Sequence, residues 1–246
     1  MANVKTIATW GLTGKTTMAV NLATTLAIMN SKALVCLLST QNTYGDIQGF
    51  FGQTIQPNHS LLRAFEEGAD LTTCLWKASV QDNNPLSRIF LLSLPNQVEL
   101  FDIPRPSFAE AEMLLDKLRG LGIFDYIVVD GASDIREPLS TAALAQAQQV
   151  LCLHRPGIAS LHWYISIKNI LGQLDDGNRV RHIEYAHDDS CSADKYFSSL
   201  NLKAGAVVPL VRNARQYENE GIPIVQNASR EAITFAKAMQ GLVASL

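Results

Sequence analysis

Short apolar runs alternate with segments of helical periodicity along almost the whole chain, and this alternation limits the folds that the chain can adopt. The runs that predict strands lie at residues 4–8, 33–38, 89–94, 126–130, 149–154, 180–185 and 206–210. Strands separated by helices need crossover connections, which produce a mostly parallel sheet with helices on both faces. We therefore predict a doubly wound α/β fold. The 246 residues are 47% hydrophobic, which is enough for one large core in a single domain spanning 1–246.

Three of the predicted helices have clear sequence signals. Residues 15–29 carry apolar side chains at helical spacing directly after the first predicted strand. In the helix predicted at 108–121, Ser107 and Glu110 form a capping box. The last helix, 229–246, is amphipathic but has few basic residues, so we interpret it as a core-packing or dimer helix and not as a membrane anchor.

Residues 9–17, TWGLTGKTT, carry part of a phosphate-binding loop between a strand and a helix. The full motif has a glycine, four residues and then Gly-Lys-Ser/Thr, and Thr9 stands at the position of the first glycine. Backbone N–H groups at a helix start bind phosphate oxygens, and the lysine adds a positive charge. The alternative is a chance Gly-Lys-Thr at a strand-to-helix turn. The residues that we expect to bind a nucleotide here are Gly11, Thr13, Gly14, Lys15, Thr16 and Thr17.

The strand predicted at 126–130 ends in Asp130. A buried strand that delivers one carboxylate at its end supplies a magnesium ligand opposite a phosphate-binding loop, where the threonine hydroxyl is a second ligand. We predict a Mg²⁺ site at Thr16 and Asp130. The alternative is that Asp130 only caps the next turn.

Taken together, these motifs resemble the MinD/ParA group of P-loop ATPases. The matching segments are 14–17, 124–130, 207–209 and 221–223, the last followed by an Ala-rich helix. Within that group, segments 44–47 and 50–52 are similar to the TadZ/CpaE branch, which positions pilus and secretion machinery. The resemblance implies ATP and Mg²⁺ as cofactors, a homodimer across the nucleotide face, and partners from pilus, secretion or polar-localisation systems.

Several positions depart from the family pattern. The family's signature lysine, which reaches the partner's phosphates, is replaced by Trp10, and the second loop glycine by Leu12. The two aspartates that end the second strand are replaced by Ser39 and Gln41, so Asp46 is the nearest remaining carboxylate and the one weak catalytic candidate. A cation supplied in trans is worth roughly 10³–10⁵ in rate. We therefore expect an atypical, slow or inactive ATPase that still binds nucleotide, because binding uses ground-state contacts.

Two further expectations concern the nucleotide cavity. The family's adenine-reading asparagine has no equivalent at 186–187, so base contacts are expected from Pro209, Val211 and Arg212. In an alternative interpretation, Trp10 fills the phosphate site and the chain is a nucleotide-free interaction module.

Net charge and cysteine use limit the other functions. The formal net charge of -3 provides no global field for nucleic acid or anionic membranes. A small cationic face at Arg212, Arg215 and Arg230 is diluted by neighbouring glutamates, and we interpret it as a solvated surface. The cysteines form no C-x-x-C pair, and no leader or membrane span is recognised, so we expect a cytoplasmic protein that reaches a cell pole or membrane only through partners.

One polar cluster near the end of the strand predicted at 180–185 has the composition of a metal site but no standard ligand spacing. A polar strand end leading into a loop explains it equally well. Its members are His182, Glu184, His187, Asp188, Asp189 and Cys191.

The interpretation that follows is a dimeric, ATP-binding positioning or scaffolding subunit of a pilus, secretion or conjugation machine. Three alternatives remain open: a plasmid- or chromosome-partition ATPase that binds DNA non-specifically, a small-molecule kinase, and the nucleotide-free module.

Overall fold

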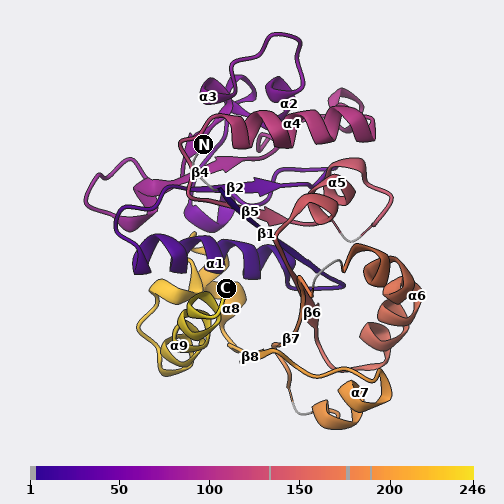
Figure 1. Cartoon of the computed structure of the whole chain (residues 1–246). Coiled ribbons are helices and arrows are strands. Elements are labelled where there is room, and N and C mark those ends of the chain that lie inside the picture. The colour runs from indigo at the N-terminus through magenta and orange to yellow at the C-terminus, as the bar shows by residue number, and fades with distance from the viewer. Residues whose placement is uncertain (1–3, 133, 176–177, 189) are drawn as a thin grey trace.

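The computed structural model describes residues 4–132, 134–175, 178–188 and 190–246. Its described strands form an eight-stranded sheet in the order β3-β4-β2-β5-β1-β6-β7-β8 (Figure 1). Every neighbouring pair is parallel except β3 and β4, which confirms the predicted fold class. The strands are β1 (Lys5–Gly11), β2 (Val35–Ser39), β3 (Trp76–Lys77), β4 (Ile89–Leu92), β5 (Tyr126–Asp130), β6 (Gln149–His154), β7 (Val180–Tyr185) and β8 (Ala206–Val208).

The strand predictions differ from the structure mainly at the ends. β1 continues to Gly11, beyond the predicted end at residue 8, because Thr9, Trp10 and Gly11 pair with β6. The short antiparallel strand β3 was not predicted, since two residues carry no periodic signal. The loop between β1 and the first helix is therefore only three residues long, 12–14.

The helices lie on both faces of the sheet. Residues 15–29 are helical as predicted, the capping box of Ser107 and Glu110 is present, and Ser229 caps the last helix. The described α-helices are α1 (Lys15–Met29), α2 (Leu61–Ala64), α3 (Leu71–Cys74), α4 (Phe108–Gly120), α5 (Pro138–Gln146), α6 (Ile158–Leu174), α7 (Ala193–Ser199), α8 (Ala214–Asn219) and α9 (Arg230–Ala244). None of the described helices is long and apolar enough to cross a bilayer.

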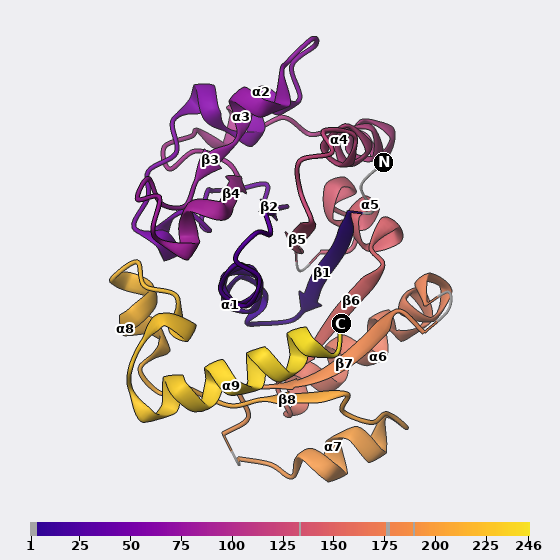
Figure 2. The same ribbon diagram turned by 60° about the vertical axis from the view of Figure 1, so that its left-hand side comes forward.

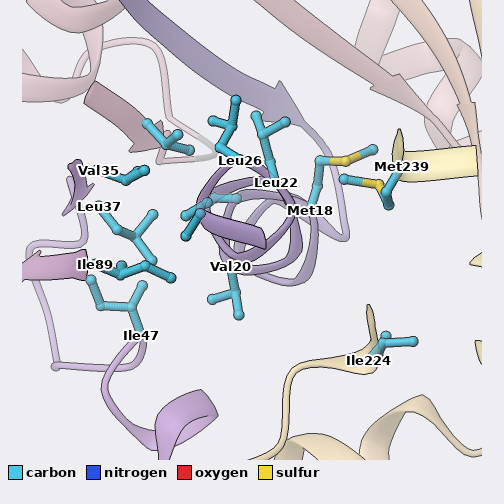
Figure 3. Packing of buried hydrophobic residues seen from close by; sticks show 14 of the residues in the cluster. Met18, Val20, Leu22, Leu26, Val35, Leu37, Ile47, Ile89, Ile224 and Met239 are labelled. Atoms are coloured by element: carbon cyan, nitrogen blue, oxygen red, sulfur yellow. The ribbon is translucent and has the colours of Figure 1, made fainter. Parts of the chain in front are cut away.

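One core layer contains α1, which lies between the sheet and α9 (Figures 1 and 2). Val20 and Leu22 point to different sides of α1, and both are fully buried (Figure 3). The helix is therefore covered by protein on more than one side. Phe235 and Met239 of α9 are buried in the same layer, which confirms α9 as a core-packing helix.

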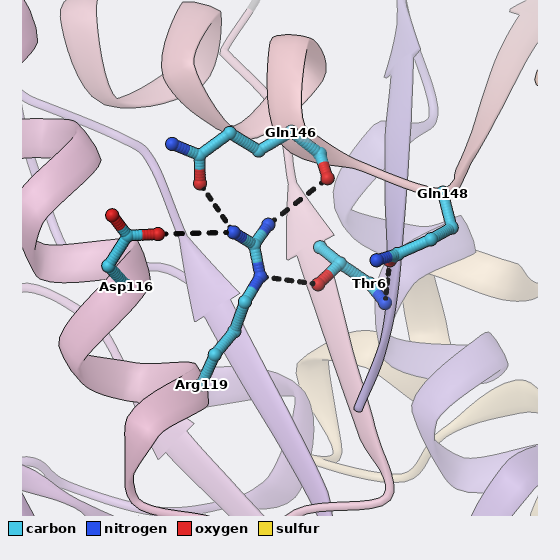
Figure 4. Close-up of polar contacts among 5 residues, drawn as sticks. All are labelled: Thr6, Asp116, Arg119, Gln146 and Gln148. Carbon is cyan, nitrogen blue, oxygen red and sulfur yellow. Dashed lines mark hydrogen bonds and ion pairs between the residues drawn. The ribbon is translucent and has the colours of Figure 1, made fainter. Parts of the chain in front are cut away.

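The opposite core layer joins α4, α5 and α6 to the other face of the sheet. Arg119 of α4 forms hydrogen bonds to neighbouring elements of this layer (Figure 4). Its guanidinium donates to the Gln146 side chain at 2.6 Å, to the Gln146 carbonyl at 3.1 Å and to the Thr6 hydroxyl of β1 at 3.3 Å. One side chain thus links α4, the end of α5 and the start of the central strand.

Candidate functional site

The loop at 12–14 delivers the start of α1 to the carboxyl ends of the parallel strands, where ligands bind in such sheets. Gly11 must be glycine because an added Cβ would lie 2.9 Å from the Leu153 Cβ and carbonyl oxygen of β6. Gly14 has φ 79° and caps α1 without a side chain, so within the described structure no side chain caps the first-turn N–H groups. A helix start of this kind is suited to an anion.

Side chains from separate parts of the fold meet beside this helix start. The Thr16 hydroxyl donates to Asp130 Oδ2 at 2.8 Å and also lies 3.4 Å from Asp46 Oδ2. The Ser39 hydroxyl donates to Asp46 Oδ1 at 3.2 Å. The structure therefore brings both predicted magnesium ligands together and adds Asp46 to them.

Burial controls the charge of this cluster. Asp130 is 1% exposed, and burial together with the neighbouring Asp46 raises its pKa to about 8, against the opposing effects of Thr16 and Lys15. Burial also raises the pKa of Asp46. Burial lowers the pKa of the Lys15 ammonium, while Asp130 and Asp46 raise it. The two carboxylates and the lysine therefore share one poorly solvated space.

The cluster fits a magnesium ion. Asp130 Oδ1 is buried and has no hydrogen-bond partner among the described residues, and a buried carboxylate oxygen without a partner is costly. Hydroxyl and carboxylate oxygens are the ligands that Mg²⁺ prefers. Thr16, Asp130 and Asp46 offer such oxygens on adjoining elements.

Trp10 does not lie at this site. Its side chain is fully buried in the opposite core layer, and its ring packs edge-on against Trp163 of α6 with centroids 5.4 Å apart. Successive strand residues face opposite sides of a sheet, so Trp10 faces away from α1. The hypothesis that the indole fills the phosphate site is therefore wrong.

Thr17, in the first turn of α1, makes a side-chain contact that the sequence did not indicate. Its hydroxyl donates to Glu218 Oε1 of α8 at 2.5 Å. The Tyr185 ring covers Gly14, since an added Cβ there would lie 2.1 Å from a ring carbon. No local pattern could have indicated Glu218, because it lies far from Thr17 in the sequence. Thr13 is exposed at the tip of the loop.

The expected base contacts are only partly accessible. Pro209 is half-buried after β8, but the Val211 side chain is 4% exposed and belongs to the core. Arg212 is exposed, and its backbone N–H donates to Glu231 Oε2 at 2.9 Å. The Val211 side chain packs inward, so only the backbone of this residue could contribute to the expected base contact.

The polar cluster after β7 does not converge on one point. His187 lies 3.3 Å from Glu184, Asp188 pairs with Arg155 at 2.8 Å, and His182 contacts His154 of the neighbouring strand. His187 Nε2 also lies 2.6 Å from the Cys191 carbonyl oxygen, and Asp189 lies outside the described residues. A polar strand end is the interpretation that fits these contacts.

Comparison with solved structures identifies the architecture. A ParA family ATPase from Chlorobium tepidum TLS matches with a TM-score of 0.79 at 16% identity, over 98% of this chain and 99% of that chain. The septum site-determining protein MinD of Pyrococcus horikoshii, complexed with Mg-ADP, matches with a TM-score of 0.76 at 18% identity, over 98% and 95%. The fold is that of the MinD and ParA ATPases.

A third structure with the MinD/ParA fold contains a partner protein. In the MinC:MinD cell division protein complex of Aquifex aeolicus, the matching chain has a TM-score of 0.76 at 17% identity, over 98% of this chain and 95% of that chain. No family model and no curated protein matches the sequence.

Proposed function

We propose that this chain is a MinD/ParA-like protein that binds ATP and Mg²⁺ beside the first turn of α1 and acts as a dimeric positioning or scaffolding subunit. The observation that carries the proposal is the convergence of Lys15, Thr16, Asp130 and Asp46 at a helix start that has no side-chain cap. These groups match the cation, hydroxyl and carboxylate that hold Mg²⁺ and phosphates in P-loop proteins.

Charge balance supports the binding of metal and nucleotide together. Without a bound metal ion, the Asp130 carboxyl group has a pKa of about 8 and is therefore mostly protonated at pH 7. A bound Mg²⁺ would favour the ionised carboxylate and would supply positive charge for the phosphate oxygens. The Lys15 ammonium and the backbone N–H groups of α1 would hold the phosphates themselves.

We expect slow or absent ATP hydrolysis because Trp10 stands at the position of a lysine. The position of the family's signature lysine carries an uncharged ring that faces the other core layer, so it cannot contribute a cation to the nucleotide. Losing a cation of that kind costs roughly 10³–10⁵ in rate. A protein that binds nucleotide without rapid turnover is suited to a switch set by occupancy, such as a TadZ/CpaE-like subunit of a pilus, secretion or conjugation machine.

The test is the thermal midpoint of the purified chain with and without Mg²⁺-ATP, compared with Lys15→Ala. Binding at a hundred times Kd stabilises a protein by about 2.7 kcal/mol, so the wild-type midpoint should rise by several degrees and that of Lys15→Ala should not. A rise of equal size in both proteins, or in neither, would contradict the proposal. Size measurement with ATP tests the dimer, and phosphate release tests turnover.

A nucleotide-free interaction module is the second candidate, and specific contacts favour it. Tyr185 packs on Gly14, and Thr17 is engaged by Glu218, so one side of the loop is already covered by protein. This candidate predicts that Mg²⁺-ATP leaves the thermal midpoint unchanged.

A further inference from the structure

A second group of ligand-type side chains lies on the sheet face opposite α1. Cys152 and His154 are on β6 and His182 is on the adjacent strand β7. Cys152 and His182 are direct register partners, and alternation along β6 puts His154 on the same face as Cys152. One sulfur and two imidazoles thus gather on two neighbouring strands.

The three ligand atoms are already close to one another. They all lie within 4.8 Å of each other, and His154 Nε2 is 3.0 Å from His182 Nδ1. A tetrahedral zinc ion needs about 3.4 Å between two nitrogens and about 3.6 Å between sulfur and nitrogen, from its usual bond lengths. The 3.0 Å separation of the two nitrogens is slightly short and the 4.8 Å limit is longer than these values, so the three side chains would have to rotate slightly to bind the ion.

The surroundings orient His154 as they do in metal sites. His154 Nδ1 lies 2.9 Å from the Tyr196 hydroxyl, which lies 2.8 Å from the Ser160 hydroxyl. A hydrogen bond at one ring nitrogen fixes the tautomer and directs the other nitrogen at the ion. Cys152 and His154 are fully buried and His182 is only partly buried, so an ion would approach past His182.

The cluster carries no positive charge that would repel a cation. Burial lowers the pKa of His154 to about 3, and burial also lowers the pKa of His182. Both imidazoles are therefore neutral near pH 7 and can offer a lone pair. Thiolate and imidazole together suit Zn²⁺ better than Mg²⁺ or Ca²⁺.

We propose that Cys152, His154 and His182 form a Zn²⁺ site that joins β6 to β7, with a water molecule in the fourth position. Binding forms one Zn–S and two Zn–N bonds, and the thiol proton of Cys152 leaves to solvent. The affinity therefore rises with pH. The site is separate from the proposed Mg²⁺-ATP site, because the two lie on opposite faces of the sheet.

The experiment is a titration of the full-length chain, stripped of metal with EDTA, with Co²⁺ and then with Zn²⁺. The expected result is a thiolate-to-cobalt charge-transfer band that saturates at one ion per chain and disappears as Zn²⁺ displaces Co²⁺. Cys152→Ser should abolish the band. Cys36→Ser, which alters another buried cysteine in the same core layer, should leave it intact.

A second variant keeps the test decisive if Cys152→Ser does not fold. Tyr196→Phe retains all three ligands but removes the hydroxyl beside His154, so the band should remain while affinity falls roughly 10–100-fold. Absence of the band in the wild-type chain would overturn the proposal. A band that survives Cys152→Ser but is lost in Cys191→Ser, the variant of the partly exposed cysteine, would also overturn it.

Discussion

Replacing Asp130 by asparagine should make the protein more stable without nucleotide, and it should also remove the response to Mg²⁺-ATP. In the native state the Asp130 carboxyl group has a pKa of about 8, whereas its ordinary value is 3.8. Between these values the native state binds a proton that the unfolded chain has released. Stability therefore falls as the pH rises through this window.

The magnitude follows from the width of the window. Each pH unit contributes about 1.4 kcal/mol, so the cost that accumulates from the ordinary pKa to pH 7 is about 4 kcal/mol. Asparagine never ionises and removes this cost. Its amide N–H must find an acceptor where Asp130 Oδ1 has no partner among the described residues, and this unmet donor lowers the gain by about 1–3 kcal/mol. We expect Asp130→Asn to be about 2 kcal/mol more stable than the wild type at pH 7.

The assay is urea unfolding in EDTA at pH 5 and pH 7. The stability difference between Asp130→Asn and the wild type should rise by about 3 kcal/mol between these two pH values. Asp82→Asn, which alters an exposed carboxylate, should show a nearly constant difference. A difference that does not change with pH, or a variant less stable than the wild type at pH 7, would refute the reasoning. With Mg²⁺-ATP, only the wild type should gain stability.

Two other substitutions test the architecture around the site. Arg119→Ala should lower the free energy of unfolding in urea by about 2–3 kcal/mol, because it leaves polar groups of α5 and β1 without their donor. Arg63→Ala, which breaks an exposed pair with Glu66, should lower it by less than about 0.5 kcal/mol. Equal losses would contradict the role of Arg119. Trp10→Lys should not produce rapid ATP hydrolysis. It should lower the free energy of unfolding by about 3–5 kcal/mol, since it places an ammonium group in the apolar space beside Trp163. A thousandfold rise in phosphate release would show that this position faces the nucleotide.

Local sequence patterns were sufficient to predict the elements whose hydrogen bonds join residues close together in the chain. The helix at 15–29 and the capping box of α4 were predicted from spacing alone, because helix hydrogen bonds and caps join residues three or four apart. The pairing of Thr16 with Asp130 was also predictable, since the motif and the strand end both lie at the carboxyl edge of a parallel sheet.

Strand pairing decided where β1 ends and which side chains meet across the sheet, and the spacing of residues in the sequence could not predict either. The extension of β1 to Gly11 depends on β6, which lies far along the chain, and that extension turns Trp10 away from α1. Strand alternation would have indicated this direction only if the strand had been known to continue past residue 8. The register of β6 on β7 likewise decided that Cys152 and His182 meet.

The amino-acid sequence by itself determined the class of fold, the strand-loop-helix segment predicted to bind phosphate and the carboxylate opposite it, because each is encoded in short segments with their own hydrogen-bonding and burial requirements. Only the tertiary structure decided which distant side chains meet at the first turn of α1. Asp46 reaches Thr16 because the chain folds back after β2, and Glu218 reaches Thr17 from the C-terminal layer. Contacts of this kind depend on how distant segments pack together, and no local periodicity records them.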